Sequence, residues 1–72
     1  MDLTKKLELL ADLFEVETDE IIANQELDSF DPWDSMSKLS LIVMMDDELG
    51  KKLTGEQIRS FKTIQDILDF MD

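Results

Sequence analysis

The chain contains no histidine and no cysteine among its 72 residues. Without histidine it lacks the side chain that most often serves as a general base near neutral pH. Without cysteine it has no thiolate nucleophile or metal ligand and forms no disulfide. A serine with no neighbouring base is a poor nucleophile, so an autonomous serine hydrolase is not expected. The sequence therefore predicts a protein that is not an enzyme.

Basic residues are also few, with 7 lysines and arginines against 18 acidic residues and a net charge of −11. Nucleic acids and anionic membrane surfaces both require basic side chains, so neither is an expected partner. The charge favours protein partners with basic patches, which it would attract by electrostatic steering. The same acidity also keeps a small protein in solution, and composition alone leaves both interpretations open.

Long apolar runs are missing as well. No segment approaches the roughly 18 apolar residues of a membrane-spanning helix. Residues 1–6 do not resemble a signal peptide, because Asp2, Lys5 and Lys6 interrupt any apolar stretch. We therefore expect a cytoplasmic, monomeric protein. The chain starts with methionine and ends just past its last predicted helix, which favours a free-standing protein over part of a larger enzyme.

What the sequence does contain is helical periodicity in a single small domain over residues 1–72, with 43% hydrophobic residues to form a core. The predicted fold is all-α: a four-helix bundle with three main helices, a short third helix and a long first loop. The first helix is predicted over residues 3–14, with Lys5 and Lys6 away from the core. Its core-facing stripe has helical spacing: Leu3, Leu7, Leu10 and Phe14.

Residues 15–34 break this periodicity and are predicted to form the long loop, with the only proline at position 32. A short helical turn is possible around residues 19–23. Scattered apolar residues are expected to pin the loop to the core: Val16, Ile21, Ile22, Leu27 and Phe30.

The second main helix is predicted over residues 35–49, with Gly50 as its C-terminal cap. Placing its residues 100° apart gives two apolar stripes on roughly opposite faces. One is Leu41, Ile42, Met45 and Leu49, and the other is Met36, Leu39 and Val43. Either the second stripe is exposed for a partner, or the helix is central and buried on both sides.

Two start signals predict the remaining helices. Thr54 and Gln57 form a capping-box pair that opens a short helix ending near Phe61, with Ile58 and Phe61 facing inward. A second signal at residues 63–66 opens the fourth helix, which runs to Met71. One face of that helix is apolar: Ile64, Ile67, Leu68 and Met71.

Ser35 stands at the start of the second main helix. A serine there is an ordinary helix cap or first-turn residue, but the same position suits a covalently attached anion. Asp34 can take the cap role itself and leave Ser35 free. A second Asp-Ser pair ends at Ser29, but the nearby proline disfavours a sustained helix there, so Ser35 is the better candidate.

Together these segments resemble the acyl carrier protein family, small acidic helical bundles with a long first loop. Family members carry 4′-phosphopantetheine on the serine of an Asp-Ser-Leu motif, and this chain has Asp34–Met36 there. The acidic close of the second helix at Asp46–Leu49 also resembles the family. So does Thr63–Met71, which follows the family's Thr-(Val/Ile)-Gln-Asp fourth helix. The resemblance covers essentially the whole chain.

The resemblance implies that a phosphopantetheinyl transferase moves the arm from coenzyme A onto Ser35, beside Asp34. Acyl-loading and acyl-transferring enzymes with basic patches would then be its partners, in fatty-acid, polyketide or related biosynthesis. The cargo would be an acyl or aminoacyl group held as a thioester. The residues implied in partner binding are Met36, Leu39, Ser40, Val43, Asp46 and Asp47.

Some residues depart from the family pattern. Met36 replaces the usual leucine, a swap of similar volume. Ser37 and Ser40 stand where fatty-acid carriers usually place partner-facing acids, and Lys38 adds a positive charge. These departures favour a specialised carrier. Trp33 is also unusual, and its role is either packing against the loop or contact with a partner or the arm.

Two other classes stay open. One is an acidic helical adaptor that binds a protein partner without modification. The other is a calcium-binding module built from Asp28, Asp31 and Asp34, although their spacing of three and the missing glycine do not fit an EF-hand loop.

Overall fold

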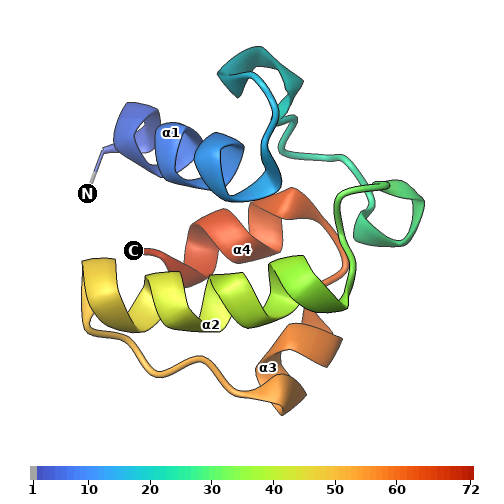
Figure 1. Cartoon of the computed structure of the whole chain (residues 1–72). Coiled ribbons are helices and arrows are strands. Elements are labelled where there is room, and N and C mark those ends of the chain that lie inside the picture. The colour runs from blue at the N-terminus through green and yellow to red at the C-terminus, as the bar shows by residue number, and fades with distance from the viewer. Residues whose placement is uncertain (1) are drawn as a thin grey trace.

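The computed structural model describes residues 2–72, and it is a helical bundle of two longer and two shorter α-helices (Figure 1). The helices are α1 (Leu3–Phe14), α2 (Ser35–Leu49), α3 (Gly55–Ser60) and α4 (Ile64–Phe70). Two single-turn 3₁₀ helices, η1 (Thr18–Glu20) and η2 (Leu27–Ser29), lie in the long loop between α1 and α2. The predicted all-α architecture is confirmed, including the boundaries of α1 and α2.

Every one of the four α-helices begins with a side-chain cap. Asp2 accepts a hydrogen bond from the Lys5 N–H at 2.8 Å at the start of α1, and Asp34, Thr54 and Thr63 open the other three with capping boxes. At its other end α2 stops at Gly50, which has the positive φ of 62° typical of a glycine cap. Local sequence signals therefore set where the helices begin and end.

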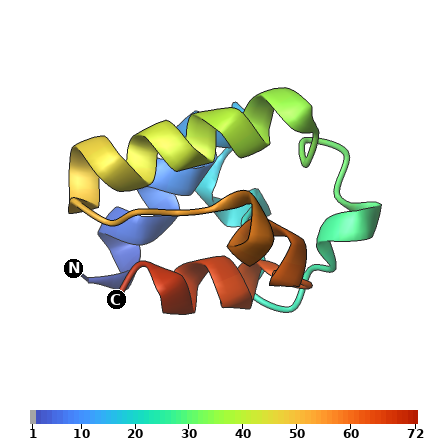
Figure 2. The same ribbon diagram turned by 90° about the horizontal axis from the view of Figure 1, so that it is seen from below.

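The core lies between the inner faces of α1, α2 and α4, closed by residues from the loops and α3 (Figures 1 and 2). The predicted inner face of α4 is confirmed. In α3 Ile58 is buried, whereas Phe61, just after this helix, is half-buried. The buried apolar residues are Leu10, Ala11, Phe14, Ile21, Leu27, Leu41, Met45, Leu53, Ile58, Ile64, Ile67, Leu68 and Met71.

The predicted stripe of α1 is wrong at its first turn. Leu3 is 58% exposed, whereas Lys6, expected outside the core, is buried. The Lys6 ammonium forms an ion pair with the Asp72 carboxylate, 66 residues away. This ion pair lowers the pKa of Asp72. A contact between the two ends of the chain thus overrides the local pattern.

Backbone hydrogen bonds tie the long loop to the start of α4. The Leu27 N–H donates to the Lys62 carbonyl at 2.9 Å, and the Gln65 N–H donates to the Ala23 carbonyl at 2.8 Å. Ile21 and Leu27 are buried as predicted, while Ile22 is exposed, because the loop turns it away from the core. The loop is therefore anchored at several points along its length.

The start of α4 holds one perturbed carboxylate. The Asp66 side chain accepts hydrogen bonds from the Lys62 N–H at 2.8 Å and the Thr63 N–H at 3.1 Å. These two donors stabilise the charged form and lower the pKa of Asp66 below its ordinary value of 3.8. The ionised Asp66 carboxylate thus binds the backbone between α3 and α4.

None of the helices within residues 2–72 has both the length and the apolar character needed to cross a membrane.

Candidate functional site

The site centres on the first turn of α2, where Asp34 and Ser37 cap the helix reciprocally. The Ser37 N–H donates to Asp34 Oδ1 at 2.9 Å, and the Asp34 N–H donates to Ser37 Oγ at 2.9 Å. The Ser37 hydroxyl also donates to the Asp34 carbonyl at 3.0 Å. The cap of α2 therefore consists of Asp34 and Ser37, with Ser35 between them in sequence.

Ser35 is exposed and takes no part in this cap. Ser35 is not the helix cap but the first residue of α2, so of the two ordinary structural roles only the first-turn position is confirmed. The alternative that Asp34 caps the helix is also confirmed. The Ser29 hydroxyl, in contrast, donates to the Glu26 carbonyl at 3.2 Å and accepts from Gln25 Nε2 at 3.1 Å. Of the two serines that follow an aspartate, Ser35 is the one whose hydroxyl is available.

Ser37 corrects one sequence-based expectation. Its alignment with partner-facing acids of fatty-acid carriers suggested an outward position, but Ser37 is buried. Its side chain is committed to the cap, which explains why a small hydroxyl stands there. Ser40, one turn later, is exposed as expected.

A surface groove of about 490 Å³ runs from Ser35 between α2 and α3. Its lining includes two basic side chains, Lys38 on α2 and Arg59 on α3, and is otherwise largely apolar. The remaining lining residues are Leu39, Ile42, Gly55 and Ile58. Sequence reasoning missed Arg59, because no local signal tells which part of α2 the short α3 lies against.

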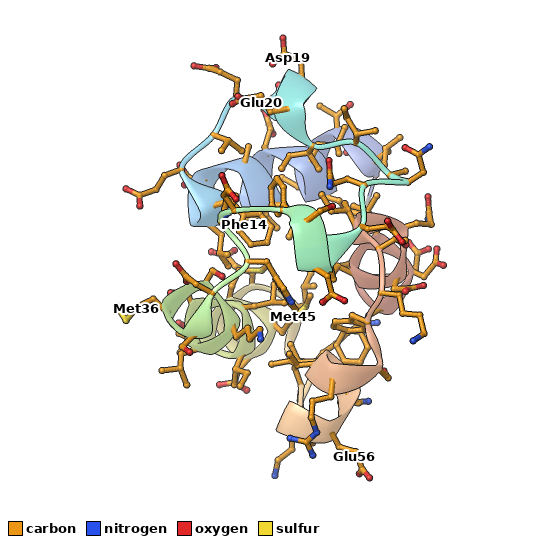
Figure 3. The ribbon with its side chains drawn as sticks, turned by 90° about the vertical axis from the view of Figure 1, so that its right-hand side faces the viewer. Phe14, Asp19, Glu20, Met36, Met45 and Glu56 are labelled. Carbon is orange, nitrogen blue, oxygen red and sulfur yellow. The ribbon has the colours of Figure 1, made fainter. Side chains whose placement is uncertain are left out.

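The outer face of α2 carries an exposed apolar strip. Met36, Leu39 and Val43 are 73%, 62% and 58% exposed, whereas Leu41 and Met45 on the opposite face are fully buried. Figure 3 shows Met36 pointing away from the bundle, while Met45 lies toward its interior. The alternative of a central helix buried on both sides is therefore wrong.

Acidic side chains follow the apolar strip at the far end of α2. Asp46 and Asp47 are exposed there, so α2 presents an apolar first half and an acidic second half along one side of the molecule. An exposed apolar patch with a charged rim is typical of a surface that binds another protein.

Trp33 supports the site from within. Its ring lies 6.2 Å from the Phe14 ring in an edge-on arrangement, and the Lys38 ammonium lies 5.4 Å from its centroid. Trp33 is half-buried, so it packs the end of the loop against α1 as expected. The indole thereby fixes the segment that leads into Asp34.

Asp28, Asp31 and Asp34 do not form a calcium site. Across residues 2–72 the structure brings together no group of three or more carboxylates that could hold a metal ion. Asp34 is committed to the helix cap instead. The calcium-binding alternative is therefore wrong for the described residues.

Comparison with known proteins adds an independent finding. The family model described as "phosphopantetheine attachment site" matches residues 7–71. No solved structure matches the chain.

The chain is also similar to three proteins named acyl carrier protein. The relative from Micrococcus luteus is 38% identical over 39 residues, which cover 54% of this chain and 48% of that protein. The relative from Myxococcus xanthus is 37% identical over 38 residues, covering 53% and 48%. The relative from Thermosynechococcus vestitus is 27% identical over 70 residues, covering 97% and 86%. The chain thus spans about half the length of the first two relatives and most of the third.

Proposed function

The chain belongs to the phosphopantetheine attachment family, and on that premise we propose that it is an acyl carrier protein that holds its arm on Ser35. Family membership implies a covalently attached 4′-phosphopantetheine group. Its thiol would carry acyl groups as thioesters. The observation that carries the proposal is the division of roles at the start of α2. Asp34 and Ser37 cap the helix, so the exposed Ser35 hydroxyl is free to be modified.

The attachment step would be catalysed by a partner transferase. Ser35 Oγ would attack the phosphorus of coenzyme A that bears the pantetheine, forming a new P–O bond. The P–O bond to the rest of the nucleotide would break, 3′,5′-bisphosphorylated adenosine would leave, and the hydroxyl proton would pass to a base on the transferase or to water. The chain itself offers no histidine or cysteine for this chemistry.

This chain's own contribution would be positioning. The capped helix holds Ser35 at a fixed place, and tethering raises the effective concentration of a cargo at each partner's active site. Met36, Leu39 and Val43 would form the apolar docking strip, with Ser40 at its edge. Asp46 and Asp47 would steer basic patches of the transferase and of acyl-handling enzymes. These contacts should be weak, because a carrier must leave each partner in turn.

We place the carrier in the cytoplasm and in fatty-acid, polyketide or related biosynthesis. The relatives, each named acyl carrier protein, support the acyl-carrying role. The neutral Ser40 and the basic Lys38 on the outer part of α2 favour a specialised carrier over a general fatty-acid carrier.

Intact-protein mass spectrometry tests the attachment. The parent, incubated with coenzyme A and a broad-specificity phosphopantetheinyl transferase, should gain the mass of one arm, and Ser35→Ala should gain none. Ser29→Ala is the matched control and should gain one arm like the parent.

Two results would contradict the proposal. Gain of an arm by Ser35→Ala would move the attachment to another residue, with Ser29 the next to test. No gain by a folded parent would favour the alternative of an acidic adaptor that binds a protein partner through α2 without modification.

A further inference from the structure

The groove between α2 and α3 has a charge opposite to that of the molecule. Its lining contains two cations, Lys38 and Arg59, and none of the described residues that line it is acidic. In the whole chain acidic residues outnumber basic ones by 18 to 7. The groove lining is therefore positively charged, although the chain as a whole is strongly negative.

Both cations are free to meet an external anion. The ion pair found within residues 2–72 joins Lys6 to Asp72, and no carboxylate oxygen in that range lies within 4.0 Å of the charged nitrogens of Lys38 or Arg59. Lys38 is positioned over the Trp33 ring at 5.4 Å, and Arg59 is exposed on α3. The Arg59 guanidinium also reaches back over Gly55, on the groove side of α3.

We propose that Lys38 and Arg59 bind the phosphate of the arm and thereby direct the arm along the α2–α3 groove. This inference rests on the proposed attachment at Ser35. The phosphate would be bonded directly to the Ser35 oxygen, so it would stay beside the groove whatever the cargo. Lysine and arginine are the usual side-chain ligands of phosphate, and Lys38 shares a helix face with Ser35 because it follows three residues later.

The apolar part of the groove lining suits the part of the arm that follows the phosphate. Leu39, Ile42 and Ile58 provide apolar surface beyond the two cations. An arm anchored at its phosphate would cover this surface and lose part of its freedom between visits to partners. Exposed ion pairs are weakened by salt, so salt should release the arm from the groove.

Amide chemical shifts of ¹⁵N-labelled protein test the proposal. The parent is converted to the free-thiol form, which has no cargo carboxylate, and intact mass verifies that one arm is present. Attachment should then shift the amides of Gly55, Ile58 and Arg59 on α3. The double variant Lys38→Gln with Arg59→Gln should lose at least half of that change, and so should the parent in about 0.5 M salt.

The double variant Lys5→Gln with Lys52→Gln is the matched control, because it removes the same two charges from exposed positions outside the groove. It should keep the full response of α3. Arm attachment verified by mass without any shift on α3 would overturn the inference and leave the attachment intact. So would a full response in the double variant, or a response that appears only when the thiol carries a carboxylate-bearing acyl group. Failure of the parent to gain mass would instead contradict the proposed attachment at Ser35, and this inference would fail together with that proposal.

Discussion

At the scale of single residues, the site depends on which side chain caps α2. Asp34 and Ser37 form the reciprocal hydrogen bonds that cap the start of α2. Ser35, which lies between them in sequence, takes no part in these hydrogen bonds. Sequence reasoning identified Asp34 and Ser35 as the important pair and left their roles open. It noted that Ser37 stands where fatty-acid carriers place partner-facing acids but did not identify its role in the cap, because the reciprocal hydrogen bonds are visible only once the helix start is fixed.

Removing the Asp34 side chain should destabilise the fold through the loss of this cap. Asp34→Ala is expected to lower the free energy of unfolding by about 1 kcal/mol, and Asp34→Ser should restore most of it. Urea unfolding followed by circular dichroism measures the change. Asp31→Ala, an exposed neighbour, serves as control and should stay within about 0.5 kcal/mol of the parent. An equal loss in both variants would mean that the cap contributes nothing specific.

Asp66 gives stability a defined dependence on pH. Its pKa is lowered in the folded state by two backbone donors, so its contribution is present above the ordinary value of 3.8. That contribution is lost as pH falls through the lowered folded pKa. Asp66→Asn should cost about 1 kcal/mol near pH 7, and the difference from the parent should shrink below pH 4. Unfolding curves of both proteins at several pH values test this, and a difference that does not change with pH would contradict it.

At the scale of elements, α2 has apolar residues on two opposite faces. Leu41 lies fully in the core, and Leu39 is mostly exposed in the proposed docking strip. Helical periodicity separated the two stripes from the sequence. It did not tell which one was buried, because that depends on how α1 and α4 pack against α2.

Two leucine variants should separate the two faces. Leu41→Ala is expected to lower the free energy of unfolding by 2–5 kcal/mol, roughly the range for buried leucines, whereas Leu39→Ala should change it by less than about 0.5 kcal/mol. In the transferase assay Leu39→Ala should have the larger effect of the two variants and should reduce kcat/KM several-fold. Wild-type transfer by a folded Leu39→Ala variant would remove Leu39 from the docking strip.

At the scale of the whole molecule, contacts between residues distant in sequence fix features of the fold that local sequence signals do not predict. The caps and periodicity predicted the four helices, but the burial of Lys6 and the hydrogen bonds from the loop to α4 join residues distant in sequence. Lys51 is a further example, because its ammonium donates to the Phe70 carbonyl at 2.9 Å and to the Asp72 carbonyl. It also lies 5.6 Å from the centre of the Phe70 ring. The packing of α3 beside Ser35 forms the groove, and it too was not predicted by local sequence signals.

Lys51 therefore joins the segment after α2 to the end of the chain. Lys51→Met should lower the free energy of unfolding by about 1–2 kcal/mol, because a charged donor to two carbonyls is lost. Lys52→Met, at the exposed next position, is the matched control and should have little effect. Chemical unfolding of both variants makes the comparison, and equal stabilities would contradict a specific role for Lys51.

The central claim is that the arm is attached to Ser35 because Asp34 and Ser37 form the cap. The most direct measurement is the fragmentation spectrum of the modified protein after cleavage at lysine and arginine. That cleavage releases residues 7–38 as one peptide containing Ser29, Ser35 and Ser37. The account predicts that fragments locate the arm on Ser35 alone. Location of the arm on Ser29 or Ser37 would contradict it.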